Sequence, residues 1–356
     1  MQMGKRHLFL NDLLEMKKIT ILCFLILFLM GMNTPNQAQM IDTITMIPYP
    51  KIWIEHSLVE LELDLPWAEF LGSYSPSKES HKGSFSYKTN HEKGTFKAKF
   101  SVVDELNEKP DFTCFPIICI DLPKKQINGS IWEGQDKYQL LILCDTPIKE
   151  DTNSLMLEYL AYQLFQKFHP VFFYSRLCRV NIIETGKAIK ISSSLALLIE
   201  YPNEMAKRYR GKLLDLYLLH PNFCESTTMA RVSLFEWMIG NSNWSVQRLH
   251  GLQLVSMRDF PPVAVPLYFS NSKFVKQYVQ NPFDTPYKGI CSSEELLLNE
   301  MQRLISFQDE FLRLIDQSEL PIQIQSKAKQ YIIEFMNAAS KSAEFQEFIH
   351  DQCQKE

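Results

Sequence analysis

Residues 153–168 read NSLMLEYLAYQLFQKF, a strongly apolar stretch. Thr152 or Asn153 can cap the first turn of a helix and Pro170 cannot continue one, so the sequence predicts a single helix over 153–168. Short apolar runs separated by polar turns precede this helix and are typical of strands. The clearest is 58–65, where LVELELDL alternates apolar and polar residues.

The region after this helix starts with two more strand-like runs, 171–183 and 189–200, and helices dominate beyond Tyr201. Upstream, the stretch 73–93 is rich in Ser, Lys, His and Gly, and it predicts a loop or a poorly packed hairpin.

Taken together, these patterns predict an α+β protein with two lobes. The first lobe, residues 40–170, is β-rich and includes the helix 153–168. The second, residues 171–356, begins with strands and is otherwise mainly helical. Ligands usually sit in a cleft between such lobes, which is where the sequence places a candidate site.

Composition excludes several classes of protein. Apolar residues make up 46% of the 356 residues, so the chain can bury a large core. Its 12 glycines are too widely spaced for G-x-G-x-x-G. Gly129 and Gly134 have P-loop spacing, but Gln135 and Asp136 follow where Lys and Ser or Thr are required. A net charge of −4 without a dense basic stripe argues against nucleic acid as a partner.

Residues 1–39 predict an N-terminal extension and a signal peptide. Two lysines precede the apolar run 19–32, which is shorter than the roughly 20 residues that a membrane-spanning helix needs. Either Met1 or Met16 serves as the start. Removal of the segment leaves no transmembrane span and predicts an exported protein, periplasmic or extracellular.

Export changes the interpretation of the cysteines, because disulfides persist in oxidising compartments. Seven cysteines follow the predicted signal peptide, and an odd number leaves at least one thiol unpaired within a monomer. Cys114 and Cys119 form a C-x4-C pair without a second pair of ligands, so a zinc site is not expected. The sequence also lacks G-x-S-x-G and H-E-x-x-H, which argues against common hydrolases.

Six strings in a fixed order carry a family resemblance. They are EYLAYQLF (158–165), RLCRVNII (176–183), LLIEYPNEMAKR (197–208), FEWMIGNSNWSVQRLH (235–250), PPVAVPLYFSNSKFV (261–275) and TPYKGICSSEEL (285–296). Over about residues 95–340, the chain resembles a bacterial exported family related to CotH-like (spore-coat) atypical kinases. The resemblance implies a two-lobed protein-kinase-like fold.

In active relatives, the resemblance implies an ATP-binding lysine on a strand, a glutamate on the next helix, an aspartate in a G-N-x-D-W-S loop, an asparagine after the loop's histidine, and a metal-holding D-F-D segment. This chain departs from that pattern at nearly every charged position. The degenerate equivalents are Gln139, Asn243, Gly251, Tyr268 and Ser270. Only Glu158 is retained.

These replacements remove the groups that phosphoryl transfer needs. Metal ions held on carboxylates, together with a lysine, cancel the charge of the phosphates, and an amide such as Asn243 cannot act as a base. The leading hypothesis is therefore an exported pseudokinase without a cofactor, a binding or scaffold component of the cell envelope whose partner is an envelope protein or polymer. One alternative is an active transferase that uses ATP with Mg²⁺ or Mn²⁺ and recruits Asp259 or Lys137. The other is a purely structural exported protein.

Lys137 and Glu158 are the candidates for nucleotide binding. Lys137 lies two residues before Gln139 and on the same side of the strand, so a Lys137–Glu158 pair can mimic the ion pair of the family. The alternative interpretation is a glutamate at the edge of the helix that faces water.

Further polar residues also have two interpretations. Asn241, Asn243 and His250 can bind a polar ligand in the cleft, or they can hold their loop together above a packed Trp244. Asp259 is a displaced metal ligand or an ordinary turn residue.

Two disulfides are candidates. Cys114 and Cys144 lie on runs that can form neighbouring strands, and both match cysteine positions of the family. Cys224 with Cys291 is the second candidate pair. Spacing alone does not determine the connectivity.

Overall fold

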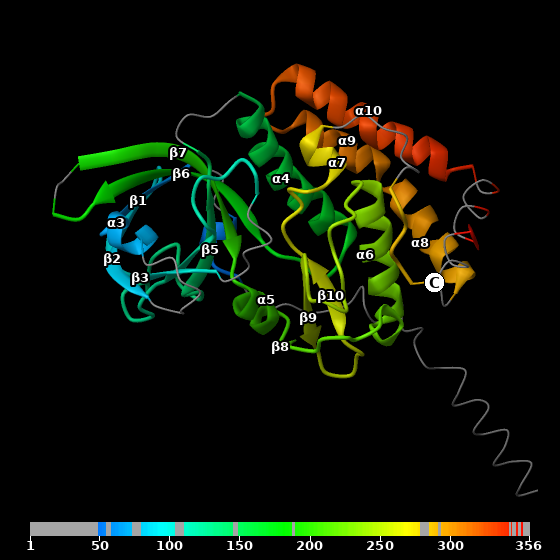
Figure 1. Cartoon of the computed structure of the whole chain (residues 1–356), viewed down its shortest axis with the longest axis horizontal. Coiled ribbons are helices and arrows are strands. Elements are labelled where there is room, and N and C mark those ends of the chain that lie inside the picture. Colours follow the sequence, from blue (N-terminus) through cyan, green and yellow to red (C-terminus); the bar gives the residue numbers. More distant parts are fainter. Residues whose placement is uncertain are drawn as a thin grey trace, which may run out of the picture. The chain divides into compact units, whose positions relative to one another are not determined.

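In the computed structural model, strands from both sides of the central helix join in one sheet (Figure 1). The structure describes residues 49–54, 58–72, 80–103, 110–144, 149–186, 189–277, 285–290 and 293–341, with 343, 347, 350 and 351. The sheet is a closed barrel in the order β1-β2-β3-β4-β5-β7-β6. Its strands are β1 (Val59–Leu65), β2 (His81–Lys88), β3 (Lys93–Val102), β4 (Ile118–Asp121), β5 (Lys137–Ile142), β6 (Ser175–Glu184) and β7 (Ile189–Glu200).

The first strand closes the barrel. β1 pairs antiparallel with β2 on one side and parallel with β6 on the other, and the remaining pairs are antiparallel. The alternation of LVELELDL is confirmed, because Val59, Leu61, Leu63 and Leu65 are fully buried inside the barrel.

Aromatic rings fill the barrel interior. Trp132 is fully buried and packs edge-to-face against Phe85, Tyr87 and Tyr138, with ring centroids 4.9, 5.6 and 5.0 Å away. Edge-to-face contacts of this kind add to the free energy gained by burying the rings. The interior is therefore a packed core.

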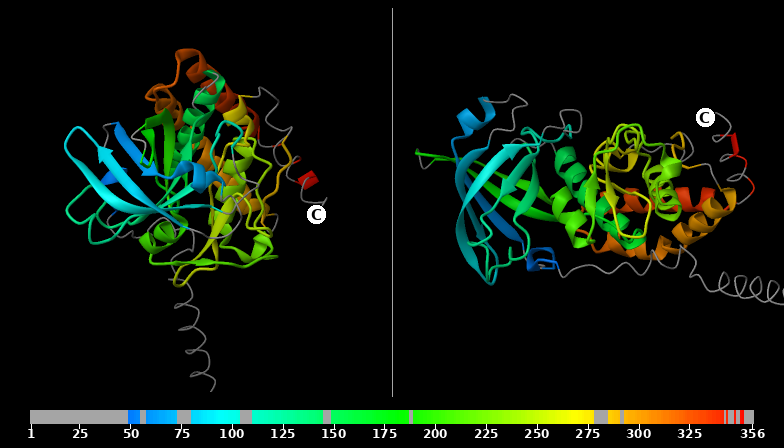
Figure 2. Two further views of the ribbon diagram at one scale, coloured as in Figure 1. Left: turned by 60° about the vertical axis from the view of Figure 1, so that its left-hand side comes forward. Right: turned by 90° about the horizontal axis from the view of Figure 1, so that it is seen from below.

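Helix α4 (Lys149–Phe168) contains the predicted helix 153–168 but begins four residues earlier, so Thr152 and Asn153 lie inside it and the predicted cap is wrong. It contacts β6, β7, α7 and α9. Figure 2 shows α4 between the barrel and the C-terminal helices. The other helical elements are η1 (Lys51–Trp53), α3 (Trp67–Gly72), α5 (Pro202–Arg208), η2 (Pro221–Phe223), α6 (Ser226–Met238), α7 (Lys273–Lys276), α8 (Glu294–Ser306), α9 (Gln308–Asp316) and α10 (Ile322–Ala339). Helix α6 is buried on all sides, as expected for a helix without a polar face.

A second sheet lies among these helices. It has three antiparallel strands in the order β10-β9-β8, namely β8 (Lys212–Leu214), β9 (Leu252–Ser256) and β10 (Val263–Pro266). α5 contacts β8 and α6 contacts β10, so this sheet is packed between the two helices. The loops that leave α6 and β10 carry most of the predicted site residues.

The expectation of a two-lobed α+β fold of the protein-kinase type is wrong. All the described residues belong to one compact unit, Thr45–Glu356, whose main sheet is a closed mixed barrel. Strands β6 and β7, expected to open the second lobe, complete this barrel by pairing with β1 and β5. Residues after 171 supply five strands in all, so they do not form a mainly helical lobe. The alternation of apolar residues identifies a strand but not its partner in a sheet.

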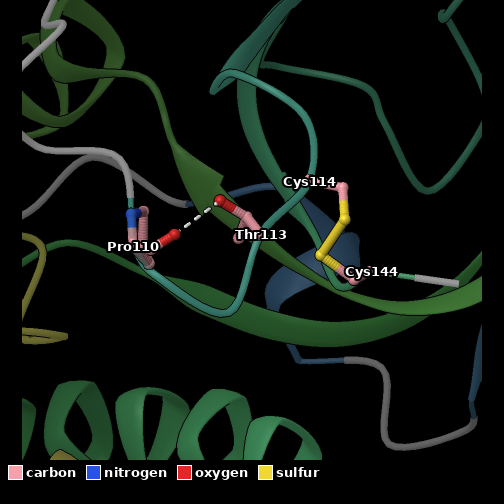
Figure 3. The surroundings of a disulfide bond; sticks show 4 residues. All are labelled: Pro110, Thr113, Cys114 and Cys144. Carbon is pink, nitrogen blue, oxygen red and sulfur yellow. Dashed lines mark hydrogen bonds between the residues drawn. A yellow bond between two sulfur atoms is a disulfide. The ribbon is translucent and has the colours of Figure 1, made fainter. Parts of the chain in front are cut away.

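The predicted disulfide between Cys114 and Cys144 is confirmed (Figure 3). Cys114 and Cys144 directly follow Thr113 and Leu143, which form an isolated antiparallel β-bridge, so the disulfide extends that pairing just before β4 and after β5. Cys119, Cys178 and Cys224 are buried free thiols, and Cys291 lies outside the described residues.

The predicted extension and signal peptide, residues 1–39, also lie outside the described residues. Within the part of the chain that the structure describes, no helix combines the length and apolar character needed to span a membrane.

Candidate functional site

Gln139, which the predicted resemblance aligns with a lysine, lies in a buried network of hydrogen bonds. Gln139 is on β5 and is 2% exposed. The hydroxyl of Tyr268 donates to Oε1 of Gln139 at 2.8 Å, and the backbone N–H of Tyr268 donates to the hydroxyl of Tyr162 on α4 at 2.9 Å. Tyr268 follows β10 and has a φ of 63°, an uncommon conformation for a large residue. Its ring therefore fills the space beside Gln139.

Glu158 is completely buried on α4. Its Oε1 accepts a hydrogen bond from the backbone N–H of Phe269 at 2.7 Å. Burial raises the pKa of Glu158 to about 8, although the bond from Phe269 favours the charged form. The side chain is thus a neutral carboxylic acid at pH 7.

A second buried acid, which the sequence analysis missed, lies near Glu158. Glu236 on α6 is fully buried, and its Oε2 accepts from Nδ2 of Asn241 at 2.8 Å. Burial raises the pKa of Glu236 to about 8, and the nearby Glu158 adds to the increase, whereas Asn241 opposes it. Glu236 lies near the C-terminal end of the apolar helix α6, and an acidic residue among apolar neighbours was the signal in the sequence that could have revealed it.

We call this group the Glu158 cluster. It consists of Gln139, Glu158, Tyr162, Glu236, Asn241 and Tyr268. Oε2 of Glu158, Oε1 of Glu236 and the hydroxyl of Ser270 are buried and have no hydrogen-bond partner among the described residues. Among the described residues, the network therefore satisfies only one carboxylate oxygen of each acid.

The remaining charged candidates lie elsewhere. Lys137 pairs with Asp121 at 3.5 Å, and Glu158 is buried, so neither the predicted Lys137–Glu158 pair nor a glutamate facing water is found. Asp259 is in the exposed turn between β9 and β10, with a φ of 68° and Arg258 at 3.8 Å. No group of three or more metal-ligating side chains occurs among the described residues.

The loop after α6 gathers the candidates Asn241, Asn243 and His250. Asn241 is buried, and its Oδ1 accepts from the backbone N–H of Asn243 at 3.0 Å. Ser245 and His250 exchange two backbone hydrogen bonds of 2.8 and 3.0 Å. Trp244 in the same loop is buried, with 4% of its surface exposed.

Gly251, which the predicted resemblance aligns with an asparagine, has a structural role in this loop. Its φ is 65°, and a Cβ atom at this position would lie 2.9 Å from the carbonyl oxygen of Asn243. The backbone therefore requires a glycine here, because only a residue without Cβ allows this approach.

A pocket of about 310 Å³ opens beside this loop, and we call it the Trp244 pocket. It is lined by His220, Pro221, Ser242, Asn243, Trp244, Ser245, Val246, Gln247, Arg248, His250 and Lys288. Nζ of Lys288 donates to the carbonyl oxygen of Ser242 at 2.5 Å. Burial, and then the charge of Arg248, lower the pKa of Lys288. None of the described residues that line this pocket is acidic.

The sequence analysis missed a larger pocket of about 550 Å³ between α4, β6 and α9. Its wall includes Met156, Tyr159, Gln163 and Gln166, which recur every three to four residues along one face of α4. This spacing was visible in the sequence. However, a helix face that mixes polar and apolar residues can line a pocket or face open solvent, and the sequence does not predict which.

Comparison with known proteins adds no relative. No family model matches the sequence, and no curated protein is significantly similar to it. The resemblance to CotH-like kinases therefore stays a prediction.

Proposed function

We propose that this chain is an exported binding protein without phosphotransfer activity, and that it recognises an anionic group in the Trp244 pocket. The observation that carries the proposal is the lining of this pocket, in which Arg248 and Lys288 are joined by His220 and His250. Such a set of donors suits phosphate, sulfate or carboxylate oxygens.

The closed Glu158 cluster supports the absence of phosphotransfer. The hydroxyl of Tyr268 bonds Gln139, and the backbone N–H of Phe269 bonds Oε1 of Glu158, so the protein itself supplies partners to both positions that the resemblance aligns with the lysine and the glutamate of active relatives. The disulfide between Cys114 and Cys144 suits an exported protein.

Isothermal titration calorimetry with inorganic phosphate tests the binding site. We expect saturable binding by the wild type and a loss of at least tenfold in affinity in the double variant Arg248→Ala/Lys288→Ala. Arg258→Ala is the matched control, because Arg258 is 94% exposed and lies outside the pocket. Equal phosphate affinity of all three proteins would show that phosphate does not bind in the Trp244 pocket.

A thermal-shift series with ATP tests the absence of phosphotransfer. We expect no additional stabilisation when Mg²⁺ or Mn²⁺ is added with ATP, because the Glu158 cluster has no charged ligand to offer. A metal-dependent increase of several degrees in Tm, or incorporation of phosphate into any substrate, would contradict the proposal.

A purely structural role is the second candidate function. The filling of the Glu158 cluster by Tyr268 favours it, since a protein that uses no cleft can bury these groups. Absence of any phosphate, sulfate or carboxylate binding at the Trp244 pocket would select this alternative.

A further inference from the structure

The segment between β8 and α6 carries an unusual group of exposed apolar side chains. We call residues 216–223 the apolar loop. Leu216, Tyr217, Leu218 and Phe223 are 43, 65, 85 and 69% exposed. Single exposed apolar residues are common, but four within eight positions of one loop indicate a contact surface.

Hydrogen bonds define the path of this loop. Leu218 has a φ of 64°, and its backbone N–H donates to the carbonyl oxygen of Gln247 at 2.8 Å. Nδ1 of His220 accepts from the backbone N–H of Asn222 at 3.3 Å and caps η2. The exposed side chains are therefore presented by an ordered turn.

The apolar loop and the Trp244 pocket are neighbours. His220 and Pro221 belong to the loop and also line the pocket, and Gln247 holds Leu218 and lines the pocket as well. Figure 1 shows the segment from β8 to α6 running past the strands of the second sheet. Exposed apolar side chains thus lie next to a group of basic ones.

We propose that this face docks on a membrane containing anionic phospholipids. The apolar loop enters the headgroup region, and the Trp244 pocket takes a lipid phosphate; this second contact rests on the proposed function. Apolar side chains bordered by cationic ones suit the surface of an anionic bilayer, which offers hydrocarbon beneath a layer of phosphates.

Size and charge favour a lipid surface over a protein. A stable protein interface buries about 800 Å² on each partner, whereas the apolar loop offers only four exposed apolar side chains. The whole chain carries a net charge of −4, whereas the described lining of the pocket is basic and has no acidic residue, so the pocket marks a face that an anionic bilayer attracts. Asp215 is the single acidic residue in the segment 215–223.

Vesicle flotation tests the proposal with the full chain, using phosphatidylcholine vesicles with and without 25% phosphatidylglycerol. We expect binding only to the anionic vesicles and a loss of about tenfold in Tyr217→Ser/Leu218→Ser. Ile322→Ser is the matched control, because Ile322 is also exposed, at 78%, but starts α10. Phosphate affinity, measured in solution, should be unchanged in the loop variant.

Insertion itself has a direct readout. In Tyr217→Trp, brominated acyl chains should quench fluorescence well beyond the wild-type level, whereas Ile322→Trp should show no additional quenching. Equal vesicle binding by the wild type and the loop variant, or no binding to anionic vesicles, would overturn the docking proposal. Concentration-dependent dimerisation that Leu218→Ser abolishes, without vesicle binding, would assign the face to a second copy instead.

The two proposals fail in different ways. If the wild type bound anionic vesicles but not phosphate, the proposed anion site in the Trp244 pocket would be refuted, and the apolar loop would remain as the membrane contact. Intact phosphate binding without vesicle binding would refute the membrane contact alone.

Discussion

The Glu158 cluster and the Trp244 pocket are neighbouring groups of polar side chains with opposite properties. Asn241 belongs to the first and adjoins the second, because its side chain bonds both Glu236 and the N–H of Asn243. In the cluster, burial raises the pKa of both acids, and the protein itself supplies one hydrogen bond to each of them. In the pocket, cationic groups remain accessible. Exposure, more than residue type, separates these two groups, because only the exposed cationic side chains are accessible from solvent.

The largest expected effect comes from emptying the cluster. Tyr268→Ala should lower the free energy of unfolding by about 4 kcal/mol, because it leaves a cavity and an unpaired Gln139. Tyr268→Phe should cost about 1–2 kcal/mol, since it removes only the hydrogen bond. Urea denaturation measures both, and Arg258→Ala should stay within about 0.5 kcal/mol of the wild type. If Tyr268→Ala were as stable as the wild type, the side chain of Tyr268 would not be a packed part of the Glu158 cluster.

The buried acids make stability depend on pH. The pKa of Glu158 is raised from 4.5 to about 8. Between these pH values, the Glu158 carboxyl group is ionised in the unfolded protein and protonated in the folded protein. The wild type therefore loses stability as the pH rises from about 4.5 to 8 and levels off above that.

Glu158→Gln should remove the part of this loss that comes from Glu158, while its side-chain oxygen still accepts from Phe269; the part that comes from Glu236 should remain. We expect the variant to be more stable than the wild type by roughly 3 kcal/mol at pH 7, with a much smaller difference at pH 4.5. Urea denaturation at both pH values checks the prediction. A constant difference between the two proteins across this range would mean that Glu158 is ionised in the folded state.

A variant at the boundary of the two regions should affect both. Asn241→Ala removes the bond to Glu236 and the acceptor for the N–H of Asn243, so we expect a loss of about 2 kcal/mol in stability and a severalfold loss in phosphate affinity. Asn243→Ala keeps that N–H and is exposed, so its stability should change by less than about 0.5 kcal/mol. Unchanged phosphate binding in Asn241→Ala would show that the regions are independent.

Local patterns in the sequence predicted the elements better than their arrangement. The helix 153–168 and the alternation at 58–65 were identified, because both depend on neighbouring residues. The stretch 73–93 was predicted as a loop or weak hairpin, yet β2 occupies positions 81–88 and pairs with β1 and β3. Only Phe85 and Tyr87 of this strand are buried, so its mainly polar composition concealed it.

The candidate site was also predicted only in part, because local patterns do not show how distant residues pack together. Gln139, Glu158 and Tyr268 do meet, but the sequence did not reveal that they meet inside a filled core. The Trp244 pocket combines Asn243 and His250 with Lys288, a residue about 40 positions away that no local pattern connects to them. Long-range packing decides whether such residues face each other or water.

The smallest expected effect concerns the charge within the pocket. Burial and the charge of Arg248 lower the pKa of Lys288, so Arg248→Gln should raise that pKa toward its ordinary value. Titration of Nζ by NMR on labelled lysine measures the change, and Arg258→Gln should leave it unaltered. Because both side chains are exposed, stability should change by less than about 0.5 kcal/mol. Phosphate should raise the same pKa in the wild type, since a bound anion favours the ammonium form; no response to phosphate would place the anion away from Lys288.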